Sequence, residues 1–515
     1  MSTAELVAKP AIKSASRASL ACILAAFLLS GFFAVRNLST WHTRITYPGE
    51  ESYEGAALAE IVRLRQGVPI YAPPSDKGFA GATYGPLYYL LGSRLVNPDN
   101  PSYSPLRILS ALAILGCAAC CGLLAFWLSR SYAAAFLGPL VFLSYGMTTD
   151  TGISALPDAV ALVLFLCGFL VAYRFRNSKA ILLAVPVMCL GFYYKPQYVA
   201  GPLAVFLFLV LKRRYARAAQ FLGALSLLGF GLLGFFQWIV FPGQEFWRHF
   251  LFYQAPLLSW HRFEVGLLVF VFILGAPLLL AADYLRRYPD RLLGCYLACA
   301  VLLGLATIGK DGSGVRYFFE CVLLISTLIP ALLAKNIASG TRNAEIVFLL
   351  FVSLLCGQAF RRPVPQPADF TRNHAIQSFL RRNFPVHSKS LGVYPADLMQ
   401  AGLEVPFDDL YQLSQLAHRG KVSDRGLVGQ VRNRRFAVIV LDLDLRTERD
   451  PYRLNYWLTG PLRNAIQSDY ELHVRLRAPS SERHGNQRWL YVYVPRSSPS
   501  IGGQPRRLPV DIPPS

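Results

Sequence analysis

Three glutamates lie close together in the stretch YPGEESYEGAAL, residues 47–58. Helical spacing would place Glu50 and Glu54 one turn apart on one face, with Glu51 beside them. A carboxylate placed in this way can take a proton from a reacting hydroxyl or amine, and carboxylate neighbours can raise its pKa. The structural alternative is a solvated first helical turn, where the helix dipole favours negative charge. We take Glu50 and Glu51 as candidate catalytic residues and Glu54 as a candidate substrate-binding residue.

Charged residues also interrupt apolar stretches far from this cluster. Asp158 begins one stretch, Lys195 separates two others, and Lys310 and Arg316 flank a glycine-rich turn. Cations of this kind could bind a phosphate and stabilise the charge that develops as it leaves. Each residue has an ordinary alternative, because lysine and arginine can extend to lipid headgroups and Asp158 can cap a helix. The turn itself, GKDGSG at 309–314, could bind an anion through its backbone, but it lacks the complete P-loop pattern.

The elements that must position these groups are those of a membrane protein. Of the 515 residues, 54% are hydrophobic and 16% are charged, whereas soluble domains have nearer a quarter charged residues. Apolar runs of about 17–25 residues can cross the hydrocarbon core as helices, and about eleven candidate runs are present, the shorter ones needing neighbouring residues. We therefore predict a polytopic α-helical membrane domain over residues 1–360. The runs are 18–35, 106–128, 132–146, 156–173, 180–193, 196–211, 218–241, 264–282, 292–308, 317–334 and 344–359.

Basic residues predict how these spans are oriented. They gather at the N-terminus and on alternate connections, such as 174–179, 212–217 and 286–291. Cytoplasmic connections carry such an excess, so we expect a multi-pass cell (inner) membrane protein whose N-terminus is cytoplasmic and whose C-terminal region is exterior. The first run could be a signal peptide, but without a convincing cleavage site we favour an uncleaved span. The net charge of +21 reflects this asymmetry and a basic tail, and gives no reason to expect nucleic acid as a partner.

The first exterior loop, 36–105, is expected to contain a helix over residues 50–66. Its apolar residues recur at helical spacing but are too few to cross the bilayer, so the helix should lie flat at the interface. Proline and glycine clusters then predict a loop, and YGPLYYLL at 84–91 returns to the membrane with tyrosines at interface depth. Tyr84, which begins this motif, is a further candidate for substrate binding.

The composition changes from residue 361, where we predict a soluble exterior α/β domain that extends to residue 495. Helices are expected in HAIQSFLRRNF and LVGQVRNRR, a strand in KSLGVYP, a buried strand in FAVIVLDLD, and alternating edge strands in YELHVRLRA and RWLYVYVPR. The final segment, 496–515, is rich in proline, glycine and serine and is expected to be disordered.

Cysteine and histidine usage gives no case for a disulfide framework or a metal site. All ten cysteines fall in or beside predicted spans, and buried cysteine usually behaves as a small hydrophobe. The eight histidines are scattered along the chain. We expect no cofactor and metal-independent chemistry, although an acidic cluster could hold a divalent cation through oxygen ligands.

Several of these motifs together resemble the GT-C class of integral membrane glycosyltransferases. An acidic pair after the first span, an interfacial helix and then GVPIYAPP…YGPLYYLL resemble the first exterior loop of that class. The branch that is most similar is the bacterial one related to protein mannosyltransferases, aminoarabinose transferases and rhizobial lipopolysaccharide-core transferases. Residues 156–166, 193–214 and 309–325 resemble later segments. One departure matters, because the family usually has an aspartate in the acidic pair, so either Glu50 or Glu51 could act.

The resemblance implies an inverting transfer of a sugar from a polyprenyl-phosphate donor in the membrane to an exterior lipid, glycan or protein acceptor. Glu50 or Glu51 would act as general base on the acceptor. Cationic residues would meet the phosphate, and the remaining candidates would contact or orient substrate. The set of substrate-binding candidates is Glu54, Tyr84, Asp158, Lys195, Lys310 and Arg316.

Two interpretations outside this class stay open. A polytopic lipid-linked sugar transporter or flippase would also have intramembrane charges, but transporters often contain two related halves, and the sequence has no evident repeat. A non-catalytic membrane scaffold would use the exterior domain to bind partners. The long acidic first exterior loop favours the enzyme over both.

Overall fold

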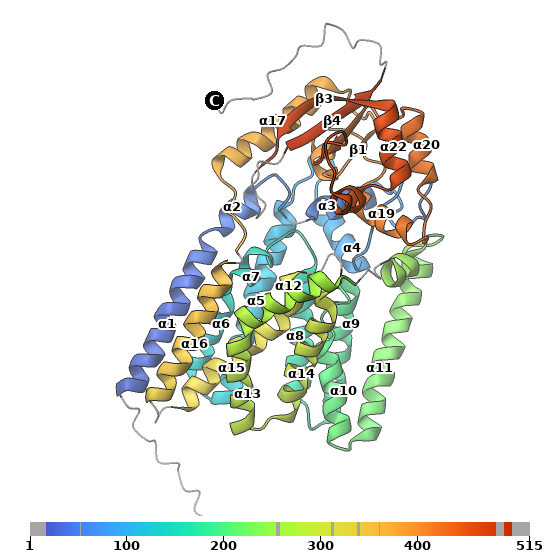
Figure 1. The fold of residues 1–515 in the computed structure, drawn as a ribbon. Coiled ribbons are helices and arrows are strands. Elements are labelled where there is room, and N and C mark those ends of the chain that lie inside the picture. Colours follow the sequence, from blue (N-terminus) through green and yellow to red (C-terminus); the bar gives the residue numbers. More distant parts are fainter. Residues whose placement is uncertain are drawn as a thin grey trace, which may run out of the picture.

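The computed structural model describes residues 17–51, 53–253, 258–310, 314–336, 340–359, 361–479 and 489–496. Within these ranges the chain forms a helical bundle with a smaller α/β domain over one end (Figure 1). Helix α1 (Arg17–Leu38) begins at the end of the bundle far from that domain. The start of the first span and the C-terminal domain therefore lie at opposite ends of the bundle, as an odd number of spans requires.

Each of the eleven predicted apolar runs is helical in the structure. Seven continuous helices in the described ranges are long and apolar enough to cross a membrane, and shorter apolar helices fill the remaining runs. The prediction of a polytopic α-helical membrane fold is confirmed. The helices are α1, α5 (Ser104–Ser129), α6 (Tyr132–Ser144), α8 (Asp158–Arg174), α9 (Ala184–Tyr194), α10 (Ala200–Leu211), α11 (Tyr215–Gly234), α12 (Trp260–Phe270), α13 (Ala276–Arg287), α14 (Arg291–Ile308), α15 (Phe319–Lys335) and α16 (Gly340–Ala359). Helices α12 and α13 form one run, because the π-helical segment Val271–Gly275 joins them.

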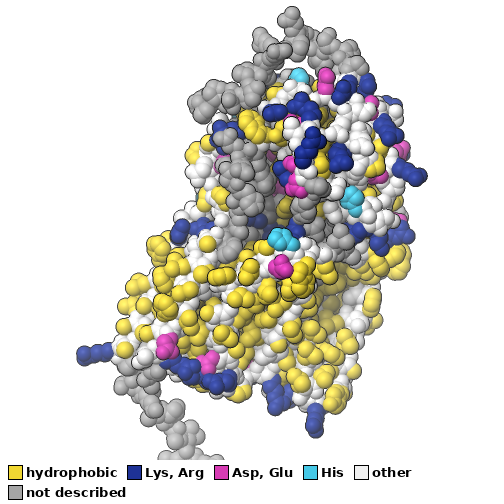
Figure 2. Space-filling view, in the orientation of Figure 1, with side chains coloured by type: hydrophobic (Ala, Val, Ile, Leu, Met, Phe, Trp, Pro, Cys, Tyr) yellow, Lys and Arg dark blue, Asp and Glu magenta, His cyan; other side chains and the backbone are white. Residues whose placement is uncertain are grey.

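Helix α15 lies at the centre of the bundle and α11 at its edge. Every residue from Phe319 to Ala334 in α15 is buried, whereas only Ala218 and Phe221 are buried in α11. Apolar side chains cover the outer face of the bundle (Figure 2). A helix with an apolar surface on all sides is stable in such a place only if lipid replaces water around it.

The loop predicted to be exterior, 36–105, contains α2 (Trp41–Thr46), α3 (Glu54–Arg65) and α4 (Pro86–Leu95). The helix predicted over 50–66 starts four residues later, because Tyr53 precedes it in the left-handed conformation, with φ of 53°. The helix also does not lie exposed at the interface: all residues from Glu54 to Val62 except Ala56 are buried, since the C-terminal domain covers it. Arg63 contacts that domain directly, donating to the carbonyl of Val405 at 2.6 Å.

The C-terminal domain contains a four-stranded sheet in the order β1-β2-β4-β3. Strands β1 (Ser390–Gly392) and β2 (Val438–Leu441) are parallel, and β4 (Trp489–Pro495) pairs antiparallel with both β2 and β3 (Tyr470–Arg477). The predicted strands are all present, but β4 lies inside the sheet, not at its edge, because it pairs on both sides. The predicted disordered tail is 496–515, and all of it after Arg496 lies outside the described residues.

Helices cover both faces of this sheet. Alternate residues of β2 belong to two separate apolar clusters, which explains its continuous apolar sequence: Val438 and Val440 pack toward α17, while Ile439 and Leu441 pack toward α19, α20 and α22. The helices of the domain are α17 (Pro367–Asn383), α18 (Pro395–Gln400), α19 (Leu410–His418), α20 (Arg425–Arg432), α21 (Pro451–Trp457) and α22 (Gly460–Asp469).

Candidate active site

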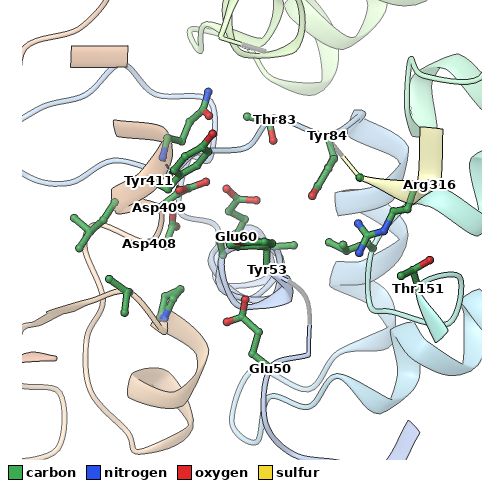
Figure 3. A pocket seen from close by; sticks show the side chains of 18 of the residues that line it. Glu50, Tyr53, Glu60, Thr83, Tyr84, Thr151, Arg316, Asp408, Asp409 and Tyr411 are labelled. Carbon is green, nitrogen blue, oxygen red and sulfur yellow. Dashed lines mark hydrogen bonds between the residues drawn. The ribbon is translucent and has the colours of Figure 1, made fainter. Parts of the chain in front are cut away.

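A cavity of about 310 Å³ lies between the bundle and the C-terminal domain. Its walls come from α3, the loop before α4, the turn after α9, the segment before α15, the linker after α16 and three segments of the C-terminal domain. Figure 3 shows Asp408, Asp409 and Tyr411 on one side, Arg316 on the other, and Glu50 and Glu60 between them. Segments far apart in the sequence therefore build one site.

Of the three clustered glutamates, only Glu50 lines this cavity. The carboxylate of Glu51 lies 2.5 Å from Arg44, and burial raises the pKa of Glu51 despite that guanidinium. Glu54 is buried and lies 2.5 Å from Arg107. Burial opposes ionisation of Glu54, but Arg107 and backbone donors, one of them the N–H of Ala155, hold its pKa below the usual value.

The cationic wall is organised around one buried carboxylate. Lys195 Nζ lies 2.7 Å from Asp158 Oδ1, and Arg316 Nη1 lies 3.5 Å from Asp158 Oδ2. The hydroxyl of Tyr198 donates to Asp158 Oδ1 at 3.2 Å, and the ring centroid of Tyr84 lies 5.4 Å from Lys195 Nζ. Two cations thus lie side by side on this wall around Asp158, an arrangement that suits an anionic ligand.

The predicted cations are not all in this site. Lys195, Arg316 and Tyr84 line the cavity, whereas Lys310 is not among the described residues that do. Lys310 instead forms a backbone bridge with Leu258.

Arg362 supplies a further cation that the sequence did not indicate. It lines the cavity from the linker that follows α16, and its Nη1 donates to the carbonyl of Glu51 at 3.1 Å. Burial and the nearby guanidinium of Arg316 lower the pKa of Arg362 to about 10. The two arginines repel one another across the site, and an anion between them would relieve that repulsion.

Three further carboxylates of the site, away from the cationic wall, were also missed. Glu60 accepts hydrogen bonds from the hydroxyl of Tyr89 at 2.7 Å and from the N–H of Ala82. Asp408 lies 3.1 Å from Arg63, and Asp409 accepts from a backbone N–H at the start of α19 at 2.8 Å. In the sequence, Glu60 belongs to the polar pattern of a surface helix and Asp409 to a helix cap. Nothing in the sequence therefore distinguished them from ordinary surface residues.

Burial, and for Glu60 also a neighbouring carboxylate, raises the pKa values of these three groups. Burial and the adjacent Asp408 raise the pKa of Glu60 well above its usual value. Burial raises the pKa of Asp408 to about 6, despite Arg63, and that of Asp409 to about 7. Near neutral pH this wall can therefore both donate and accept hydrogen bonds.

Aromatic rings complete the side of the cavity formed by the C-terminal domain. Tyr411 packs on Tyr456 with ring centroids 4.6 Å apart, and Trp457 lies 5.0 Å from Tyr456. The hydroxyls of Tyr53 and Tyr456 are 3.2 Å apart, which joins the first exterior loop to this cluster. Aromatic faces beside carboxylates can pack against the apolar faces of a sugar ring and bind its hydroxyls.

Comparison with known proteins shows the fold and leaves the reaction to be proposed. Neither a protein-family model nor a curated protein matches this sequence. Among solved structures, that of ArnT from Cupriavidus metallidurans in the apo state matches with a TM-score of 0.53 and 12% identity. The match covers 90% of this chain and 97% of ArnT.

The chain has the fold of ArnT. A second structure, ArnT from the same organism bound to undecaprenyl phosphate, matches with a TM-score of 0.52 and 11% identity over the same 90% and 97% of the two chains. Because the match spans both the bundle and the C-terminal domain, the expected arrangement of a helical membrane domain followed by an α/β domain is confirmed as a fold.

Within this ArnT fold, the described residues contain no group of three or more histidine, cysteine, aspartate or glutamate side chains arranged to hold a metal ion. Among the carboxylates that line the cavity, Asp408 lies beside Arg63, Glu60 accepts from Tyr89 and Asp409 accepts from a backbone N–H. The site thus offers acid–base groups and an anion-binding wall.

Proposed function

We propose that the protein transfers a sugar from a polyprenyl-phosphate carrier to an acceptor on the exterior face of a cell membrane. The observation that carries this proposal is the arrangement of one cavity: Glu50 on its wall, Lys195 and Arg316 around Asp158 on another, at the boundary between the bundle and the exterior domain. A base and an anion-binding site are the two features that displacement of a phosphate-linked sugar requires.

The proposed reaction is an inverting displacement at the sugar C1. The Glu50 carboxylate takes the proton of an acceptor hydroxyl or amine while the acceptor oxygen or nitrogen forms a bond to C1. The bond between C1 and the phosphate oxygen breaks, and its electron pair stays on that oxygen. The products are the glycosylated acceptor, the lipid phosphate and protonated Glu50, which returns its proton to water.

The charge of the cationic wall suits the leaving group. The donor phosphodiester carries one negative charge, and the lipid phosphate released from it carries nearly two. Lys195, Arg316 and Arg362 all line the cavity, so the wall should bind the departing phosphate, with its greater negative charge, more tightly than the donor. Interactions that strengthen as charge develops accelerate the chemical step.

A second, apolar cavity supports the proposal that the donor has a lipid carrier. It measures about 310 Å³, and its lining is almost wholly apolar side chains of α9, α10, α11 and the segment at 250–251. Tyr193 on its wall is two residues from Lys195, so a phosphate on the cationic wall would have its isoprenoid chain near this groove. The complex of the structural neighbour ArnT with undecaprenyl phosphate makes that lipid the natural first donor carrier to try.

The remaining walls suit a sugar. They offer hydrogen-bonding groups and ring faces, namely those of Glu60, Asp409, Tyr411 and Trp457. All of these except Glu60 come from the C-terminal domain. We propose that this domain forms part of the substrate site. The acceptor is a lipid, a glycan or a protein, and the chemistry of the site is shared by all three.

The test is transfer in proteoliposomes that contain the full chain and polyprenyl-phosphate sugars, with products detected by mass spectrometry. Lipids and glycans from cells with and without the protein would first identify the donor and acceptor. Transfer that depends on the carboxylate of Glu50 supports the enzyme. Movement of intact lipid-linked sugar across the bilayer without transfer would instead identify a transporter.

A further inference from the structure

Gln197 has an environment that the mechanism above does not explain. It lines the main cavity from the turn between α9 and α10, and both polar atoms of its side chain are buried with no hydrogen-bond partner among the described residues. A glutamine amide can donate two hydrogen bonds and accept two. Leaving such a group buried and unbound is costly, and native structures do so rarely.

Two residues close to Gln197 in the chain have a partner for their polar side chains. In the sequence KPQY, Lys195 and Tyr198 both bind Asp158, at 2.7 and 3.2 Å. The backbone is fixed as well, since the N–H of Gln197 donates to the carbonyl of Lys195 at 2.9 Å and its carbonyl accepts from Val199 at 3.1 Å. The backbone of the turn is therefore fixed next to Lys195 in the chain, while the side-chain amide of Gln197 is left unsatisfied.

We propose that Gln197 is a substrate-binding residue that contacts the junction between the phosphate and the sugar of the donor. Its amide nitrogen donates to a phosphate oxygen beside Lys195, and its amide oxygen accepts from a hydroxyl of the sugar. This inference rests on the proposed function, because it assigns the ligand of the same cavity. It explains why a polar side chain is kept unsatisfied in the protein without substrate.

The inference predicts opposite effects on stability and on binding. Gln197→Met has similar size but removes the unsatisfied amide, so the melting temperature of the ligand-free full chain should be unchanged or higher. The same variant should bind undecaprenyl phosphate about 10- to 100-fold more weakly, the usual effect of losing a hydrogen bond to a charged group. Gln197→Glu places a negative charge beside the phosphate and should weaken binding further.

The matched control is Gln237, a glutamine with both ends bound outside the cavity. Its amide nitrogen donates to the carbonyl of Gln244 at 2.6 Å, and its amide oxygen accepts from the N–H of Trp247 at 3.1 Å. Gln237→Met should therefore lower the melting temperature and leave binding of undecaprenyl phosphate unchanged. The pair separates a ligand-binding amide from a structural one.

The outcomes distinguish this inference from the proposed function. If the unsubstituted protein in detergent does not bind undecaprenyl phosphate, the proposed donor is wrong, and both the proposed function and the inference on Gln197 fail. If it binds and Gln197→Met binds equally well, only the inference on Gln197 is overturned. A fall in melting temperature for Gln197→Met as large as that for Gln237→Met would also overturn it, because that result means the amide is satisfied in the ligand-free protein.

Discussion

Glu50 and Glu51 are adjacent in the chain but have different surroundings. Glu50 lines the cavity, whereas the carboxylate of Glu51 lies 2.5 Å from the buried guanidinium of Arg44. The backbone brings this about, because both residues precede α3 and consecutive side chains outside a helix point in different directions. We therefore propose Glu50 as the general base and a structural role for Glu51.

Replacing each glutamate separately tests that assignment. Glu50→Gln should lower the transfer rate about 10²–10⁴-fold, the usual contribution of a general base, while the lipid-linked donor still binds. Glu51→Gln should retain most of the rate but lower the free energy of unfolding by about 1–3 kcal/mol, because it weakens the contact with Arg44. Rates in proteoliposomes and melting temperatures in detergent measure both effects. Equal loss of rate in the two variants would contradict the assignment.

The arrangement of the cationic wall predicts which lysine contributes to donor binding. Lys195→Gln and Arg316→Gln should each raise the concentration of donor needed for half-maximal rate about 10- to 100-fold, since each removes a charged contact to phosphate. Lys310→Gln should change it less than about twofold, because Lys310 does not line the cavity. Arg176→Gln, which breaks an ion pair with Asp290 outside the site, controls for the loss of one positive charge. A larger effect at Lys310 than at Lys195 would place the phosphate elsewhere.

The C-terminal domain should contribute to substrate binding directly. Trp457→Ala and Asp409→Asn should each lower the rate at limiting substrate about 10-fold or more, because they remove a ring face and a carboxylate from the cavity wall. His473→Ala alters an exposed residue of β3 in the same domain and should have no effect. Circular dichroism and melting temperature would show that the domain stays folded. If all three variants keep the normal rate, the domain is not part of the site.

Much of the fold could be predicted because lipid constrains a chain strongly. A span needs about 20 apolar residues and satisfies its backbone internally, so hydropathy alone located all eleven helices. The C-terminal strands were visible for a related reason: β2 is buried on both faces and reads as a continuous apolar run. The position of β4 was missed, since pairing on both sides depends on which distant strand joins it.

The site was harder to predict because each of its residues fits the local sequence pattern of its own segment and is not marked by residue type. Helical spacing placed Glu50 and Glu54 on one face, but α3 begins only at Glu54, after Tyr53 adopts a positive φ. Glu60 looked like the polar face of a surface helix, and only the covering domain makes it buried. Gln197 carries no charge, and its unsatisfied amide is visible only in three dimensions.

The buried acidic wall predicts how stability depends on pH. Burial raises the pKa of Asp409 from 3.8 to about 7 and that of Asp408 to about 6, so the folded protein binds more protons than the unfolded chain between about pH 4 and pH 7. The contribution of these two carboxyl groups to the free energy of unfolding should be complete below pH 4. It should fall as pH rises through that window. For Asp409 alone the loss is at most about 4 kcal/mol, from about three pKa units.

Melting temperatures measured from pH 4.5 to pH 7.5 would test this sign. Asp409→Asn cannot ionise, so its melting temperature should fall less steeply with pH than that of the unsubstituted protein. Asp444 in the same domain is the contrast: burial opposes its ionisation, but Arg446 keeps its pKa below 3.8, so Asp444→Asn should leave the slope in this window unchanged. A slope that is the same with and without Asp409 would show that its carboxyl ionises freely in the folded protein, and the acidic wall would then be negatively charged at neutral pH.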